Sequence, residues 1–159
     1  MVCGFKSLRA NQTQQMNKQE KWDSRFLRLC SQIADWSEDT SMQVGCIIVG
    51  ASNEIRTTGY NGFPRGVKDQ PERHERPTKY MWFEHAERNA IYNAARMGIS
   101  LNDTTAYVSW FPCTDCARAL VQSGIKRIVC KEPDWNFDRF DFKTSHQIFI
   151  EAGVEITFN

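Results

Sequence analysis

An alternation of strand-like and helix-like segments after an opening hairpin leaves few folds open to this chain. Short β-rich runs lie at residues 44–49, 54–60, 105–109, 127–130 and 154–158. Helical periodicity occupies residues 18–35, 84–97, 113–122 and 145–152. A hairpin pairs antiparallel, whereas strands joined through helices pair parallel, with helices covering both faces of the sheet. We therefore expect an α/β fold, a three-layer α/β/α sandwich around a mixed five-stranded sheet.

The length and the course of the chain indicate one domain. The sequence has 159 residues, within the roughly 100–200 residues that one domain usually occupies. It contains no internal repeat and no linker-like stretch. Residues 1–19 are mostly polar and lack a sustained periodicity, so we expect a flexible N-terminal tail there. Residues 20–159 are expected to form the single domain.

Composition excludes several classes of protein. Hydrophobic residues make up 41% and charged residues 25% of the chain, which is typical of a globular protein rather than a disordered one. The longest aliphatic run, residues 47–49, is far shorter than a membrane span, and no apolar signal segment opens the sequence. We expect a cytoplasmic location and no membrane partner. The net charge of +1 lacks the basic excess of nucleic-acid-binding proteins, so no nucleic acid is expected as a partner.

Two short motifs carry the chemistry, and each opens a predicted helix. They are His85-Ala86-Glu87 and Pro112-Cys113-Thr114-Asp115-Cys116. One imidazole and two thiolates are good zinc ligands, and three protein ligands leave the fourth tetrahedral position open, as in catalytic sites. Helix N-termini and metal ions both lower the pKa of cysteine, which favours the thiolate form of Cys113 and Cys116.

Glu87 is the candidate catalytic residue of this arrangement. Two thiolates already neutralise Zn²⁺, so a carboxylate ligand is not needed for charge balance. A carboxylate beside the ligands can instead take a proton from zinc-activated water and pass it on.

Other interpretations of the same residues remain open. Cys113 and Cys116 alone also match a thioredoxin-like redox pair. A structural zinc would need a fourth protein ligand, for which His74, Cys46 and Cys130 are the candidates. A chance occurrence of both motifs at two helix starts is the remaining alternative.

The two motifs together resemble the signature of the zinc-dependent cytidine and deoxycytidylate deaminases. The resemblance implies that His85, Cys113 and Cys116 bind zinc and that Glu87 is the proton shuttle. It implies hydrolytic replacement of a ring amine, with release of ammonia.

Further segments resemble the deoxycytidylate (dCMP) deaminase branch over most of residues 23–158. They are Val44-Gly45, Gly59-Tyr60-Asn61-Gly62-Phe63-Pro64, Thr78-Lys79-Tyr80, Asn89-Ala90-Ile91, Tyr107–Pro112 and Ser123–Lys126. The resemblance implies deamination of dCMP to dUMP, which supplies thymidylate synthesis.

The resemblance also assigns roles around the bound nucleotide. Asn61 would contact the sugar, the backbone N–H of Ala86 would hold the pyrimidine carbonyl, and Phe111 would line the base pocket. By position, Ser41 and Trp135 are candidates for the phosphate site, with Trp135 standing where the branch often has tyrosine.

The resemblance also implies how the protein assembles and how it is regulated. Many relatives are homohexamers activated by dCTP and inhibited by dTTP, and Arg96 matches a position at the subunit and effector interface of some of them. As a solvated arginine near a helix C-terminus, Arg96 has an equally simple structural explanation.

Three other functions are compatible with parts of the sequence. The same zinc chemistry could act on cytidine, dCTP, a modified deoxycytidylate, or a pteridine- or riboflavin-pathway pyrimidine. A deaminase of tRNA or single-stranded DNA would need more phosphate-binding cations than the interleaved basic stretch of residues 65–79 offers. A zinc-stabilised sensor without enzymatic activity is the third alternative.

Overall fold

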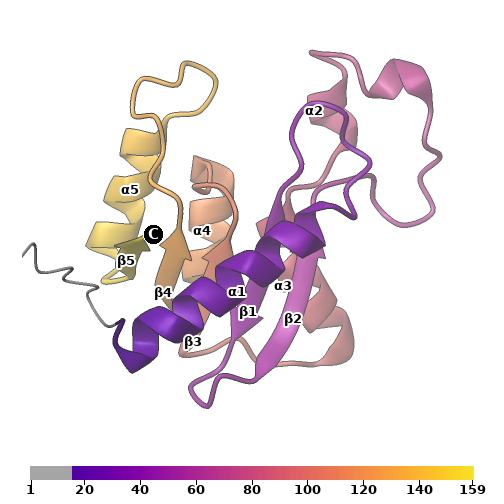
Figure 1. The fold of residues 1–159 in the computed structure, drawn as a ribbon. Helices are drawn as coiled ribbons and strands as arrows, with labels where there is room; N and C mark the ends of the chain where they lie inside the picture. Colours follow the sequence, from indigo (N-terminus) through magenta and orange to yellow (C-terminus); the bar gives the residue numbers. More distant parts are fainter. Residues whose placement is uncertain (1–15) are drawn as a thin grey trace, which may run out of the picture.

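Five strands form one mixed sheet in the computed structural model, which describes residues 16–159 (Figure 1). The strand order is β2-β1-β3-β4-β5. β1 runs antiparallel to both β2 and β3, whereas β3, β4 and β5 run parallel. The strands are β1 Gly45–Val49, β2 Ile55–Tyr60, β3 Thr104–Val108, β4 Ile125–Cys130 and β5 Glu155–Phe158. The prediction of a mixed five-stranded sheet is confirmed.

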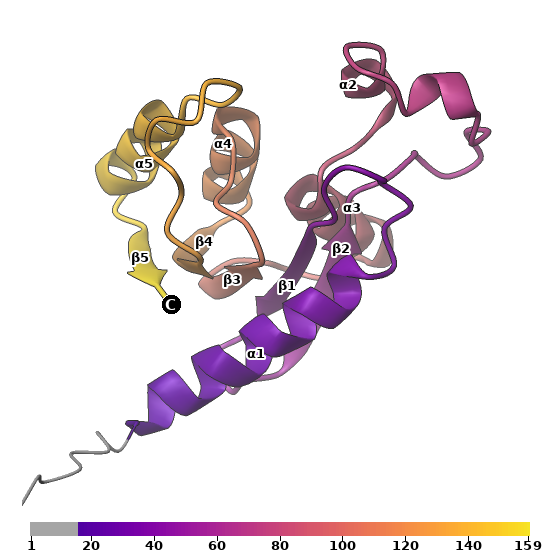
Figure 2. The same cartoon turned by 45° about the horizontal axis from the view of Figure 1, so that its top comes forward.

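Helices cover both faces of this sheet and complete the three expected layers (Figure 2). The helix α1 (Lys18–Ala34) packs on one face, where Ile47 and Val49 of β1 meet Phe26. On the other face Cys46 and Ile48 belong to a core shared with α3 (Ala86–Met97), α4 (Thr114–Gln122) and α5 (Phe142–Glu151). Successive strand side chains point to opposite faces, so two covered faces leave β1 buried along its length.

Several segment boundaries differ from the expectation. α5 begins at Phe142 rather than Ser145, because the side chain of Asp141 caps it by accepting a hydrogen bond from the Thr144 N–H. The long proline-containing loop after residue 60 includes the turn η1 (Pro71–Arg73) and leads into the four-residue helix α2 (Lys79–Trp82), which is too short for a periodic signal. Of the expected N-terminal tail, residues 1–15 lie outside the described residues, and α1 begins at Lys18.

A buried ion pair connects α1 with the strands on which it packs. The carboxylate of Asp23 accepts hydrogen bonds from Arg127 of β4 at 2.7 and 2.9 Å and from the Tyr107 hydroxyl of β3 at 2.8 Å. Burial raises the pKa of Asp23, but the hydrogen bonds from Arg127, Gln19 and Tyr107 outweigh it and hold that pKa below its ordinary value. Asp23 therefore stays ionised inside the α1 layer.

Among residues 16–159, no helix is both long and apolar enough to cross a membrane.

The helix α3 lies against the edge strand β2 at very short range. A Cβ atom added to Gly59 would sit 2.3 Å from the Ala86 carbonyl oxygen and 2.4 Å from the Ala90 nitrogen. Ala86, Ala90 and Ala94 form the buried small-residue face of α3, as the four-residue spacing predicts. On the outer edge of β2, the side chains of Asn89 and Asn93 donate to the carbonyls of Tyr60 and Thr58 at 2.8 Å.

Substituting Gly59→Ala is expected to destabilise the fold by about 2–3 kcal/mol, because backbone atoms of α3 would have to move away from β2. Thermal unfolding measures the loss. Gly62→Ala is the matched control: it lies three residues further along, and its added Cβ would meet nothing closer than Tyr60 at 4.0 Å. Equal stability of the two variants would contradict the packing described here.

Candidate active site

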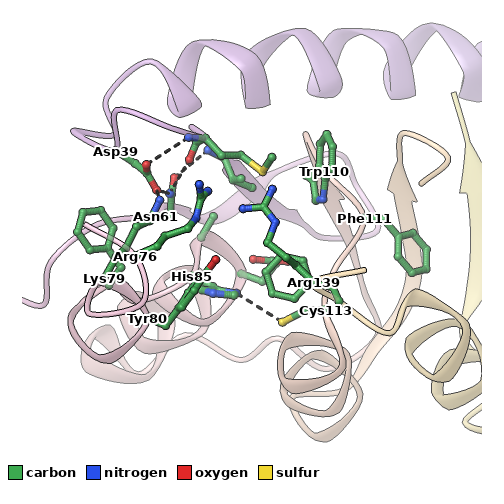
Figure 3. Close-up of a pocket in the computed structure, with 16 residues that line it drawn as sticks. Asp39, Asn61, Arg76, Lys79, Tyr80, His85, Trp110, Phe111, Cys113 and Arg139 are labelled. Carbon is green, nitrogen blue, oxygen red and sulfur yellow. Dashed lines mark hydrogen bonds and ion pairs between the residues drawn. The ribbon is translucent and has the colours of Figure 1, made fainter. Parts of the chain in front are cut away.

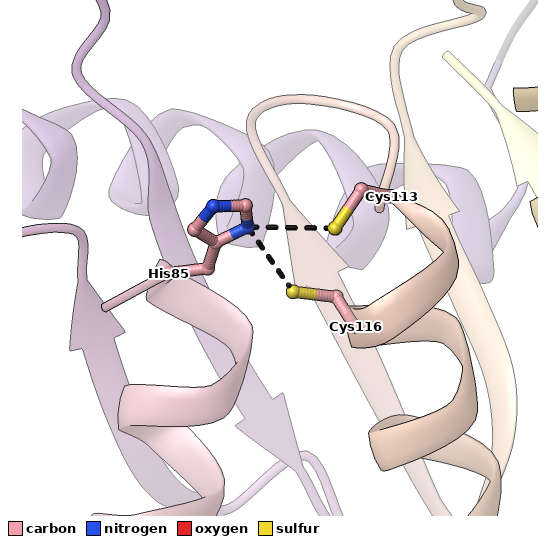
Figure 4. Close-up of side chains that lie close together, drawn as sticks. All are labelled: His85, Cys113 and Cys116. Carbon is pink, nitrogen blue, oxygen red and sulfur yellow. Dashed lines mark hydrogen bonds between the residues drawn. The ribbon is translucent and has the colours of Figure 1, made fainter. Parts of the chain in front are cut away.

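Two helix N-termini bring one histidine and two cysteines together (Figure 4). His85 is the N-cap residue of α3, and Cys113 is the N-cap residue of α4, with Cys116 in its first turn. His85 Nδ1 lies 3.5 Å from Cys113 Sγ and 3.4 Å from Cys116 Sγ. The predicted convergence of the two motifs is thus present in the fold.

The geometry of these three side chains fits a tetrahedral zinc ion. Zn–S bonds of about 2.3 Å and Zn–N bonds of about 2.0–2.1 Å place N and S ligands roughly 3.5 Å apart in a tetrahedron. The observed separations of 3.4 and 3.5 Å match that value. Over residues 16–159, this is the one group of three or more potential ligands from His, Cys, Asp and Glu. His74, Cys46 and Cys130, the candidate fourth ligands, are not in the group.

The charges of the two thiols are coupled. The hydrogen bond with Cys116 lowers the pKa of the Cys113 thiol to about 4, with burial opposing and His85 assisting. The same hydrogen bond, together with burial, raises the pKa of Cys116. Without a cation, these opposite shifts favour a thiolate at Cys113 and a thiol at Cys116. A divalent cation among them would allow both sulfurs to be thiolates.

Glu87 lies beside this group and is not a member of it. The residue is 4% exposed in the first turn of α3, and it lines the same pocket as His85 and Cys113. Burial raises the pKa of Glu87 above its ordinary value; His85 opposes this shift and Cys113 adds to it. A carboxyl group with a raised pKa can both accept and return a proton near neutral pH.

The pocket above these residues has cationic side chains at its mouth (Figure 3). Asn61, Arg76 and Lys79 come from one side, and Trp110 and Arg139 from the other. The lining residues are Asp39, Met42, Val44, Asn61, Arg76, Lys79, Tyr80, Phe83, His85, Ala86, Glu87, Trp110, Phe111, Cys113, Arg139 and Phe140.

The structure brings some of the expected substrate residues to this pocket. Asn61 and Ala86 line it next to the histidine and cysteine group. Phe111 borders it, but its ring is 2% exposed and packs against Trp135, Phe142 and Phe149 at centroid distances of 5.6–6.2 Å. In Figure 3 that ring lies away from His85, whereas Trp110 and Arg139 lie nearer.

The remaining expected residues lie outside the pocket lining. Ser41 stands behind it, where its Oγ accepts hydrogen bonds from Lys79 at 2.6 Å and Arg76 at 3.1 Å. The indole N–H of Trp135 donates to Glu132 at 3.1 Å. Arg96 is exposed in the last turn of α3, at the opposite end of that helix from His85.

Sequence reasoning missed the cations of the pocket. Arg76 enters the sequence analysis only as part of an interleaved basic stretch, Lys79 carries no assigned role there, and Arg139 lies in a loop with no motif. A signal was available for Lys79 and Tyr80, which belong to the Thr78-Lys79-Tyr80 segment. For Arg139 the sequence offers no comparable signal.

Comparison with known proteins decides the family. Residues 20–132 match the family model described as the cytidine and deoxycytidylate deaminase zinc-binding region. The chain belongs to this family. It is accordingly a hydrolytic deaminase whose cofactor is zinc, which agrees with the ligand geometry above.

Individual relatives extend the match over most of this deaminase. An uncharacterized deaminase of Aliivibrio fischeri is 39% identical over 141 residues, covering 87% of this chain and 93% of the relative. Human deoxycytidylate deaminase is 32% identical, covering 84% of this chain and 77% of the relative. The solved dCMP deaminase of cyanophage S-TIM5, in complex with dCMP and dUMP, has the same fold, with a TM-score of 0.73, 22% identity and coverage of 91% and 99%.

Elemental analysis of the purified deaminase is expected to give one zinc per chain. Cys113→Ser or Cys116→Ser should lower the zinc content well below one, because each removes one of three protein ligands. Cys30→Ala is the control, since this thiol lies on the buried face of α1 and donates to the Tyr107 carbonyl instead. Full zinc content in Cys116→Ser would contradict the assignment.

Proposed function

We propose that this deaminase converts dCMP to dUMP and ammonia, and thereby supplies dUMP for thymidylate synthesis. One observation carries the proposal: His85 and Cys113 of the ligand group and the buried Glu87 line the same pocket as the guanidinium groups of Arg76 and Arg139. A nucleotide fits this pocket with its base at the zinc ligands and its phosphate at the two arginines. Relatives named deoxycytidylate deaminase support the same substrate.

In this mechanism His85, Cys113 and Cys116 hold the zinc ion. When bound, zinc acts as a Lewis acid that makes water a stronger nucleophile near neutral pH. Glu87 accepts a proton from the water that attacks C4 and delivers it to ring N3. The attack forms the new C–O bond at C4. Glu87 then takes the remaining proton of that water from the C4 hydroxyl and transfers it to the amine, so that the C–N bond breaks, the C4 carbonyl forms and ammonia leaves. The Ala86 N–H, free at the first turn of α3, donates to the pyrimidine carbonyl.

The pocket cations support a monophosphate as the charged group of the substrate. Lys79 forms an ion pair with Asp39 at 2.5 Å, so that Arg76 and Arg139 leave a net charge of about +2. A phosphate monoester carries about −1.5 to −2 at pH 7. Burial raises the pKa of the Tyr80 hydroxyl between these arginines, but hydrogen bonds with Arg139 and Arg76 outweigh it and hold that pKa below its ordinary value. Ser41 serves this site through its bonds to Arg76 and Lys79.

We also propose a homo-oligomer, with a hexamer favoured, that responds to dCTP and dTTP. The exposed aromatic rings of Trp36, Tyr60 and Tyr92 around a second cavity support a subunit or effector surface beside β2 and α3. Arg96 is proposed to serve this interface. A cytoplasmic location is proposed because the two cysteine ligands must remain reduced, and none of the cysteines in residues 16–159 forms a disulfide.

Glu87→Gln is expected to lower kcat for dCMP by about 10²–10⁴-fold, because the amide cannot transfer protons. The loss of cytosine absorbance measures the reaction, and zinc content serves as the control, since Glu87 is not a ligand. Wild-type activity in Glu87→Gln with full zinc would contradict the proposed mechanism. A zinc-loaded wild-type enzyme that leaves the dCMP spectrum unchanged would contradict the proposed function.

Arg76→Ala and Arg139→Ala are expected to lower kcat/KM for dCMP by about 10-fold or more, because each removes a charge-assisted contact to phosphate. Activity toward deoxycytidine should change little. Arg25→Ala is the control, since this exposed arginine of α1 lines neither the active-site pocket nor the second cavity. Equal losses for the nucleotide and the nucleoside would contradict the phosphate assignment. A wild-type preference for dCTP or cytidine over dCMP would favour the alternative substrates.

A further inference from the structure

Asp39 is a buried acid on the wall of the pocket that the mechanism does not use. It is 5% exposed and lies between α1 and β1. Its Oδ2 accepts from Asn61 Nδ2 at 2.9 Å and from Lys79 Nζ at 2.5 Å (Figure 3). Its Oδ1 accepts from the backbone N–H groups of Ser41 and Met42 at 2.8 and 3.2 Å, and from the Ser41 hydroxyl at 2.9 Å. Each partner is a donor, so this position requires a carboxylate.

Asp39 is ionised at neutral pH. Burial raises its pKa, but the hydrogen bonds from Lys79, Ser41 and Met42 outweigh burial and hold the pKa below its ordinary value. The carboxylate consequently presents only acceptors to its neighbours.

Hydrogen bonds fix the orientation of the Asn61 side-chain amide. Nδ2 uses both hydrogens, one toward Asp39 and one toward the Met42 carbonyl at 2.8 Å. Oδ1 accepts from the Val44 N–H at 2.8 Å. Two acceptors face the nitrogen and one donor faces the oxygen, so these partners fix which atom is which. Among residues 16–159, the Val44 N–H uses one lone pair of Oδ1, and the second lone pair is available to a ligand.

A pyrimidine deoxynucleotide offers few donors to such a lone pair. Its amine must lie at the zinc ligands for the reaction, and its phosphate and ring oxygens are acceptors. The sugar between them carries one free hydroxyl, at C3′. Asn61 lines the same pocket as His85 and Arg76, and an acceptor that faces the sugar there can bind only that hydroxyl group.

We propose that Asp39 is a positioning residue that locks Asn61 as a hydrogen-bond acceptor and thereby makes the enzyme require a free 3′-hydroxyl on its substrate. This inference rests on the proposed function, because it presupposes a nucleotide in the pocket. In Asp39→Asn an NH₂ group replaces one carboxylate oxygen. In either orientation of the new amide, this NH₂ group faces the hydrogen-bond donors that the oxygen accepted from. Asn61 then loses its only charged partner among the three that fix its orientation, and the Met42 carbonyl and the Val44 N–H alone have to hold it.

The test compares dCMP with 2′,3′-dideoxycytidine monophosphate, which lacks only the 3′-hydroxyl. The wild-type enzyme is expected to prefer dCMP by roughly 10-fold or more in kcat/KM, because the analogue leaves the Asn61 oxygen unpaired. Asp39→Asn should reduce this preference to below about 3-fold, as should Asn61→Ala. In the double variant the second substitution should cause no further loss of preference, since both act on one contact.

The ratio of two substrates separates positioning from general loss of structure, because it does not depend on the fraction of folded enzyme. Asp23→Asn is the matched control: it also removes a buried carboxylate paired with a cation, but on the face of α1 that packs on the sheet, outside the pocket lining. It should lower stability and leave the preference at its wild-type value. An unchanged preference in Asp39→Asn, or an equal fall in Asp23→Asn, would overturn the inference. A wild-type enzyme inactive on dCMP would instead overturn the proposed function.

A measurement on the wild-type protein covers the case in which Asp39→Asn does not fold. The side-chain amide of Asn61, assigned through its loss in Asn61→Ala, should exchange its hydrogens slowly with deuterated solvent, because Asn61 is 8% exposed and both hydrogens are bonded to protein acceptors. Exchange as fast as that of an exposed asparagine would overturn the inference.

Discussion

The close contact of α3 with the edge strand β2 determines where the chemistry of this protein can occur. Gly59 has no side chain, so the backbone of α3 approaches it closely, and His85 at the start of α3 is held at a fixed height above the sheet. The strand β3 leads into α4, whose first turn carries Cys113 and Cys116. Ligands that are 28 residues apart in sequence therefore meet because two helices begin at the same end of one sheet.

The site concentrates groups that are costly to bury. Two thiols and a carboxyl group lie at or below 9% exposure around one imidazole. Two helix N-termini and a divalent cation compensate for such negative charge, and the same burial leaves Glu87 able to exchange protons. On the pocket wall Asp39 and Lys79 neutralise each other, which leaves the charges of Arg76 and Arg139 to act on a ligand.

The parts of this structure that follow local rules could be predicted from the sequence. Alternating periodicities give the sheet and its two helical layers, and the motifs around His85 and Cys113 identify the ligand group because their spacing has a direct chemical meaning. The segment from Asn61 to Glu84 has no period, and its position depends on contacts distant in sequence, such as Lys79 with Asp39 and Ser41. Arg139 reaches the pocket from another loop, and only the folded chain brings it near Tyr80.

The asparagines of α3 have a consequence for how copies of this chain can associate. Asn89 and Asn93 occupy carbonyls on the outer edge of β2 that a strand from another molecule would otherwise use. A neighbouring strand would first have to displace two side-chain amides, so continuation of the sheet from one molecule into the next is disfavoured at this edge. Assembly on this side must instead rely on complementary side-chain surfaces rather than on backbone pairing.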